Sequence, residues 1–127
     1  MGGYGILAVG AGAALGAWLR WVLGIALNAA VPNLPLGTLS ANLLGGYLVG
    51  VAVEYFSQQG GLPIEVRLFV ITGFLGGLTT FSSFSAEAVG LLMENRFAWA
   101  ILLISSHLLG SIIMTVLGIF TVRSITA

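Results

Sequence analysis

Apolar residues run along this chain in four long stretches, separated by short segments that are richer in polar and turn-forming residues. The stretches cover about residues 4–28, 36–57, 66–93 and 97–123. About 20 apolar residues are needed to cross the roughly 30 Å of hydrocarbon in a bilayer. Because lipid offers the backbone no hydrogen-bond partners, all four stretches should be helices. The pattern predicts an all-α integral membrane protein with a single transmembrane domain over residues 1–127.

The third stretch contains an irregular segment, T-G-F-L-G-G-L-T-T-F-S-S-F-S-A-E, over residues 72–87. Glycine lowers helix propensity by about 1 kcal/mol relative to alanine. Thr79, Thr80 and Ser82, which follow the glycine pair, can cap a restarted helix. The third helix is therefore predicted to break between Gly76 and Thr79.

The second half of this broken helix carries two aromatic rings and an acid. Phe81 and Phe84 lie one turn apart, which usually indicates core packing, but the positive edge of a phenyl ring can also line the route of a small anion. Glu87 is costly within a span and is by default a functional candidate. It suits an anion route only if it is protonated or bonded to hydroxyls such as those of Ser82 and Ser83, and Ser83 lies one turn before it.

Two other spans each carry a strongly polar residue with two possible roles. Arg20, which has a tryptophan on either side, either reaches back to the lipid headgroups or lines an electropositive vestibule. Asn42 either joins two helices by a hydrogen bond or offers its amide to an ion. If Asn42 binds an ion, Gly46 and Gly50, which lie below it on the same stripe of the helix, would leave room for that ion.

The fourth span carries His107, Ser111 and Thr115 at i, i+4 and i+8. Hydroxyls in helices often bond back to their own backbone carbonyls, and a lone histidine is more often a packing residue than a ligand. The alternative is that the three side chains supply successive donors to a passing ion.

Composition supports the membrane assignment and excludes several functions. Of the 127 residues, 58% are hydrophobic and 6% are charged, and the mean hydropathy is +1.10. Soluble domains carry about 25% charged residues. A net charge of zero with no basic run argues against nucleic acid, and the lack of cysteine excludes thiol chemistry. We expect no cleaved signal peptide and no enzyme activity, because the chain has neither a cationic leader nor a nucleophile–base set.

The arginines are divided equally between the two sides of the predicted bundle. Arg67 and Arg123 fall on the side of the termini, whereas Arg20 and Arg96 fall on the other. Positive charge normally decides which side faces the cytoplasm. An even division indicates dual topology and an antiparallel homodimer, although four arginines are also few enough to carry no bias by chance.

These motifs together resemble the Fluc (CrcB) family of small fluoride channels. The resemblance runs through residues 10–21, 37–50, 72–87 and 106–115, and G-G-L-T-T-F-S-x-F is its most specific motif. It implies an antiparallel, dual-topology homodimer in the cell (inner) membrane, with two pathways that export fluoride passively and confer fluoride resistance. No partner is implied other than the lipid bilayer and a second copy.

The resemblance also implies roles for individual residues. The fluoride pathway would contain Asn42, Phe81, Phe84, Ser82, Ser83, His107, Ser111, Thr115, Arg20 and Glu87. Backbone carbonyls of Gly76 and Thr79 from both copies would hold a structural Na⁺ at the dimer centre. Ser83 stands where threonine is commoner, and His107 stands where members vary.

Two other functions fit the composition less well. A dual-topology exporter of organic cations, of the small multidrug-resistance type, depends on a glutamate in its first span. The first span here has Arg20 and no acid. A structural subunit or assembly factor would leave the clustered polar residues without a purpose.

Overall fold

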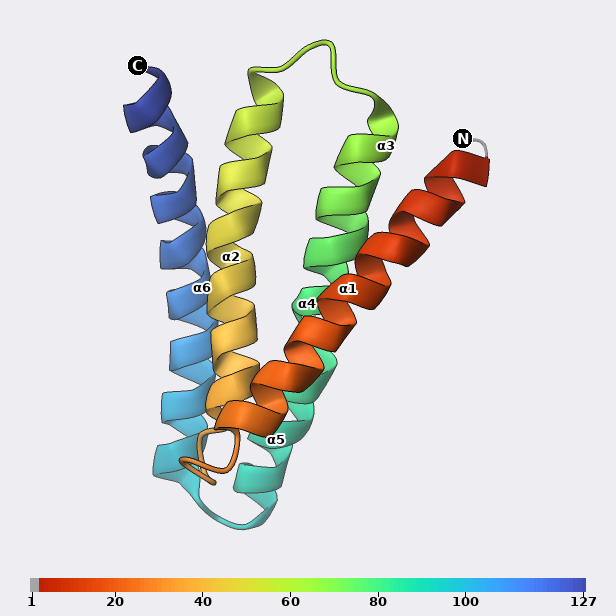
Figure 1. The fold of residues 1–127 in the computed structure, drawn as a ribbon. Helices are drawn as coiled ribbons and strands as arrows, with labels where there is room; N and C mark the ends of the chain where they lie inside the picture. Colours follow the sequence, from red (N-terminus) through yellow and green to blue (C-terminus); the bar gives the residue numbers. More distant parts are fainter. Residues whose placement is uncertain (1–2) are drawn as a thin grey trace.

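The computed structural model describes residues 3–127, which form helices joined by short connections (Figure 1). The first two helices are α1 (Gly3–Leu27) and α2 (Leu36–Ser57). The third span is composite: it contains α3 (Ile64–Arg67), a π-helical segment η1 (Leu68–Leu75), α4 (Gly76–Leu78) and α5 (Ser82–Met93). The last helix is α6 (Phe97–Thr126).

Four segments have the length and hydropathy of membrane spans: Gly3–Leu27, Leu36–Ser57, Ile64–Met93 and Phe97–Thr126. The four predicted spans are therefore confirmed, and the protein is a multi-pass membrane protein. Both ends of the chain lie at one end of the bundle together with the connection 58–63 (Figure 1). The connections 28–35 and 94–96 lie at the opposite end.

The third span breaks as predicted, but slightly later in the chain. Residues Gly76–Leu78 remain helical, and the backbone becomes extended at Thr79, with φ −84° and ψ 155°. Gly77 is used for packing instead: a Cβ on it would lie 2.5 Å from the carbonyl oxygen of Ala13 in α1, whereas Gly76 is exposed. The break itself covers residues 79–81, between α4 and α5.

Close helix packing depends on glycines throughout the bundle. A Cβ on Gly12 or Gly16 would collide with backbone atoms of the third span, which α1 crosses obliquely (Figure 1). Gly50 does not leave the space expected of it: a Cβ there would contact the Thr115 carbonyl oxygen, because α2 and α6 run side by side at backbone contact. A Cβ on Gly46 would lie 2.9 Å from the Ser111 carbonyl oxygen, but Gly46 also borders a cavity between α2, the third span and α6.

The buried apolar core is small. One cluster consists of Ala41, Ala52, Phe56, Leu75 and Leu78. The other consists of Ala88, Leu91, Ala100 and Leu103, with Leu34 and Phe84 packed against it. Many large apolar side chains instead point outward, as expected where lipid or a second protein chain replaces water.

Candidate functional site

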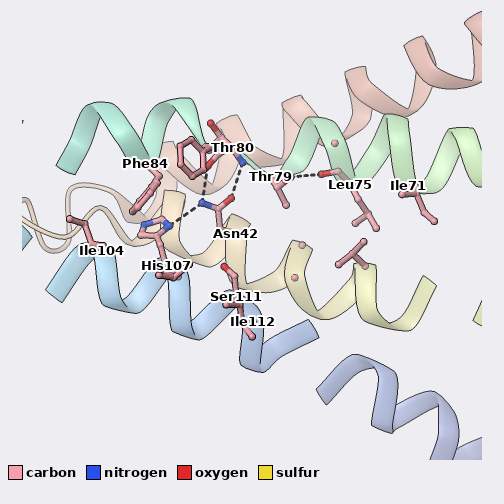
Figure 2. A pocket seen from close by; sticks show the side chains of 16 residues that line it. Asn42, Ile71, Leu75, Thr79, Thr80, Phe84, Ile104, His107, Ser111 and Ile112 are labelled. Carbon is pink, nitrogen blue, oxygen red and sulfur yellow. Dashed lines mark hydrogen bonds between the residues drawn. The ribbon is translucent and has the colours of Figure 1, made fainter. Parts of the chain in front are cut away.

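Two hollows lie beside the helix break. The first, which we call the groove, has a volume of about 630 Å³ and lies between α2, the third span and α6 (Figure 2). The second, which we call the pocket, has a volume of about 380 Å³ and lies between α1, α2 and α5. Thr80 lines both hollows. The break therefore borders two spaces of different composition.

The structure distributes the predicted site residues between these hollows. The groove is lined by Asn42, Phe81, Phe84, His107 and Ser111, together with Gly76 and Thr79. The pocket is lined by Arg20, Ser83 and Glu87. Ser82 and Thr115 line neither of them.

Asn42 binds the backbone of the break. Its Oδ1 accepts a hydrogen bond of 2.8 Å from the Thr80 N–H, and its Nδ2 donates one of 3.0 Å to the Thr80 carbonyl (Figure 2). Since the N–H needs an acceptor and the carbonyl a donor, these bonds determine which way the amide points. Asn42 thus joins α2 to the third span, which is one of its two predicted roles. Its side chain also lines the groove.

The orientation of Asn42 determines the protonation state of His107. The Asn42 Nδ2 lies 3.0 Å from the His107 Nδ1. Because the amide nitrogen is only a donor, Nδ1 must be the acceptor, and the neutral ring carries its proton on Nε2. His107 is 4% exposed, and its Nε2 has no hydrogen-bond partner within residues 3–127. The ring therefore keeps one unused donor.

The two phenylalanines meet edge to face beside this histidine. Their ring centroids are 5.4 Å apart, with an interplanar angle of 68°. Phe84 lies 4.7 Å from the His107 ring, whereas Phe81 is 79% exposed. Phe84 is thus supported by α6, while Phe81 projects from the break at the margin of the groove.

Hydroxyl groups near the groove mostly bond to the backbone. Thr80 Oγ1 accepts a 3.1 Å bond from the Ser83 N–H and lies 3.3 Å from the Ser82 hydroxyl, so the Thr80 hydroxyl satisfies an N–H of the first turn of α5, as a capping side chain does. Thr115 Oγ1 lies 2.9 Å from the Gly46 carbonyl oxygen and 3.0 Å from that of Ser111. The back-bonding alternative therefore describes Thr115.

Glu87 has a hydroxyl partner, but not the one that the helix spacing suggested. The Thr38 hydroxyl donates a bond of 2.7 Å to Glu87 Oε2, whereas Ser83 was expected to do so. The other oxygen, Oε1, is buried without a partner in the described part of the chain.

Asn28 Oδ1 accepts bonds from the N–H groups of Gly37 and Thr38, at 2.8 and 3.2 Å, and so positions the start of α2.

Arg20 points toward the third span. Its Nε donates a hydrogen bond of 3.1 Å to the carbonyl of Gly77, and its side chain lines the pocket. Of the two interpretations from the sequence, the structure favours the polar cavity over simple extension to the headgroups.

Residues Thr38, Thr80 and Asn28 belong to this site, although sequence reasoning did not assign them to it. Thr38 lies four residues before Asn42, so helical periodicity places both on one face of α2, and that signal could have identified it. Nothing in the local pattern indicates that Asn28 reaches back from its connection to the start of α2.

The carbonyl groups of Gly76 and Thr79 are among those that lose their helical donors at the break. In a continuous α-helix the Thr80 N–H would bond the Gly76 carbonyl, but it donates to Asn42. Likewise, the Ser83 N–H would bond the Thr79 carbonyl, but it donates to Thr80 Oγ1. Within residues 3–127, no group of three or more His, Asp or Glu side chains could hold a metal ion. A cation at this point would depend on such backbone oxygens.

Comparison with known proteins identifies the family. Residues 7–119 match the family described as CrcB-like protein, Camphor Resistance (CrcB). The chain belongs to the CrcB family. The match includes residues of all four spans and every residue that lines either hollow, so the resemblance inferred from the motifs is confirmed.

Individual CrcB relatives are similar over nearly their whole length. The chain is 63% identical over 123 residues to the fluoride-specific ion channel FluC of Nitrosospira multiformis, which covers 97% of this chain and 96% of the relative. It is 60% identical over 124 residues to the protein of the same name from Ralstonia pickettii, with 98% of each chain covered.

Proposed function

We propose that this CrcB protein is a fluoride-selective channel that lets fluoride leave the cell passively, down its electrochemical gradient, and so protects it from fluoride. The observation that carries the proposal is the similarity to relatives named as fluoride-specific channels, at about 60% identity over the entire transmembrane region. The chemistry of the groove supports it independently.

Fluoride is small and strongly hydrated, so a pore must replace its water by many hydrogen donors. It must do so without a charge that would trap the ion, because conduction needs weak or multiple sites. All residues that line the groove are uncharged, given the neutral state of His107. The Ser111 hydroxyl and the ring edges of Phe81 and Phe84 can supply partial positive charge along it.

The pocket has a different character that suits an entrance. Its lining contains the Arg20 guanidinium, which attracts anions, and the Thr38–Glu87 pair. Ser83 lies on the same surface. Fluoride would collect beside Arg20 in this pocket and then pass the break into the neutral groove.

We further propose that two copies associate in antiparallel orientation and provide two pathways. The even division of arginines between the ends of the bundle supports insertion both ways up. The exposure of Phe81 and of the neighbouring Gly76 supports a partner surface on this side of the third span. A second copy placed there would close the groove and exclude lipid from it.

A structural Na⁺ at the centre of this dimer completes the proposal. The carbonyls of Gly76 and Thr79, which lack their helical donors, are the expected ligands from each copy. Unwound backbone within a span presents oxygens of this kind to Na⁺ in other membrane proteins. The ion would compensate the partial negative charge of these oxygens and hold the two breaks together.

The decisive experiment measures ion release from liposomes that contain the purified protein. Liposomes loaded with potassium fluoride are diluted into fluoride-free buffer with a potassium ionophore, and an electrode records the release. We expect fast fluoride release and, in a parallel experiment with potassium chloride, release no faster than from protein-free liposomes. Fluoride release at the protein-free rate, or equal release of chloride, would contradict the proposal.

A further inference from the structure

The carbonyl of Gly77 also loses its helical partner at the break. In a continuous helix it would accept a bond from the Phe81 N–H, but the extended backbone at Thr79 takes Phe81 out of helical register. A carbonyl at membrane depth needs another donor because lipid supplies none. Arg20 supplies it: the distance from its Nε to the Gly77 oxygen is 3.1 Å.

Close packing between α1 and α4 makes this bond possible. Ala13, Gly16 and Arg20 lie on one face of α1, at i, i+3 and i+7. A Cβ on Gly16 would collide with the Phe74 carbonyl, and one on Gly77 would lie 2.5 Å from the Ala13 oxygen. The backbones are thus in contact one turn before Arg20, and the guanidinium reaches the Gly77 carbonyl from a fixed position.

We propose that Arg20 is a positioning residue for the helix break, and that its Nε–H rather than its charge performs this role. The bond holds the Gly77 carbonyl toward α1. The oxygens of Gly76 and Thr79, on either side of it, are left for a different ligand. Arg20 therefore has a structural task at the break in addition to its place in the lining of the pocket. The part of this inference that concerns Na⁺ rests on the proposed function, whereas the part that concerns the break does not.

Two uncharged substitutions separate the donor from the charge. In Arg20→Gln the amide Nε2 stands the same number of bonds from Cα as the arginine Nε, so the donor is kept. In Arg20→Met a methyl group stands at that position, so the donor is lost in a side chain of similar length. Both variants lack the positive charge, so a difference between them reports the Nε–H alone.

Hydrogen exchange of the purified, full-length protein measures the stability of the break directly. We expect amides in peptides covering residues 79–83 to exchange roughly threefold to tenfold faster in Arg20→Met than in the wild type, as for the loss of one net hydrogen bond. In Arg20→Gln they should exchange within about twofold of the wild type. Peptides from α6 serve as the internal control and should not change in either variant.

Each alternative outcome is informative. Fast exchange in both variants would assign the effect to charge, and wild-type exchange in both would show that Arg20 does not hold the break; either result overturns the inference. If Arg20→Met does not fold, Arg20→Gln and Arg20→Lys are compared instead. Lysine keeps the charge but has a methylene at the Nε position, so exchange should be faster in Arg20→Lys than in Arg20→Gln. Equal exchange in the two variants, or faster exchange in Arg20→Gln, would overturn the inference.

Thermal unfolding with and without Na⁺ tests the link to the cation. Replacing Na⁺ by N-methylglucamine should lower the midpoint of the wild type and of Arg20→Gln, and should have a smaller effect on Arg20→Met, because a ligand stabilises only the state that binds it. A wild type that does not respond to Na⁺ would remove the proposed cation site but leave the exchange result intact. A wild type that releases no fluoride would remove the channel function alone.

Discussion

The side chain of Asn42 on α2 forms two hydrogen bonds with the backbone of Thr80, through Oδ1 at 2.8 Å and Nδ2 at 3.0 Å. These bonds satisfy an N–H and a carbonyl that the broken helix cannot satisfy itself. Such groups are costly to leave unpaired within a membrane. Because Thr80 borders both the groove and the pocket, the pairing that stabilises the break also shapes the point where the two hollows approach each other.

Replacing Asn42 by leucine should therefore destabilise the protein. The Thr80 N–H and carbonyl both lose their partners, and we expect a loss of roughly 2–4 kcal/mol in unfolding free energy. Unfolding of the purified protein by denaturing detergent measures the change. Leu44→Ala, on an exposed position of the same helix, is the control; a loss no larger than that of the control would contradict the role of Asn42 as a clamp.

The edge-to-face pair of Phe81 and Phe84 should be required for fluoride transport. Changing either residue to isoleucine keeps an apolar side chain but removes the polarised ring edge. An aromatic edge contact is worth up to about 1.5 kcal/mol, so fluoride release from liposomes should fall about tenfold in each variant. The matched control is Phe120→Ile on the exposed surface of α6, outside both hollows. Wild-type release by both pathway variants would show that the rings only fill space.

Glycine packing between α1 and the third span should be sensitive to one methyl group. In Gly16→Ala the new Cβ would overlap the Phe74 carbonyl, and we expect a loss of about 1–3 kcal/mol in unfolding free energy. In Gly10→Ala, on the same helix, the new Cβ meets nothing within 4 Å. That control should be neutral or gain up to about 1 kcal/mol from its higher helix propensity. Equal stability of the two variants would refute this account of the contact.

The Thr38 hydroxyl should stabilise Glu87 in its buried position. Thr38→Val keeps the shape of the side chain but leaves both Glu87 oxygens without a partner, so unfolding free energy should fall by roughly 1–3 kcal/mol. Thr38→Ser keeps the hydroxyl and should recover most of that loss. If valine and serine variants unfold alike, the 2.7 Å contact contributes nothing measurable.

The proposed dual topology predicts that orientation responds to small changes in charge. Gln58→Lys with Gln59→Lys adds positive charge at the end of the bundle that holds the termini, whereas Ala29→Lys with Ala30→Lys adds it at the other end. Each variant alone should insert in one orientation and lose fluoride resistance, because no antiparallel partner forms. Co-expression of the two should restore resistance in cells. Full resistance from either variant alone would contradict an antiparallel dimer.

The fold followed from the sequence more completely than the site did. The helix ends agree with the apolar stretches within a few residues, because span length is set by the thickness of the bilayer. The break lies at residues 79–81 rather than starting at Gly76, because helix propensity carries no information about the packing of α1 against Gly77. The polar residues of the spans stand out as site candidates in the sequence because unpaired polar groups are rare in lipid.

The sequence by itself determined the number and nature of the spans, the presence of a break and most of the polar residues that gather beside it. Those properties depend on local hydrophobicity and composition. Only the tertiary structure decided which groups pair: Asn42 with Thr80, Thr38 with Glu87, and Arg20 with Gly77. These partners lie 38, 49 and 57 residues apart in the chain. The rotation and register of the helices that carry them are set by backbone contact at glycines, which no local pattern specifies.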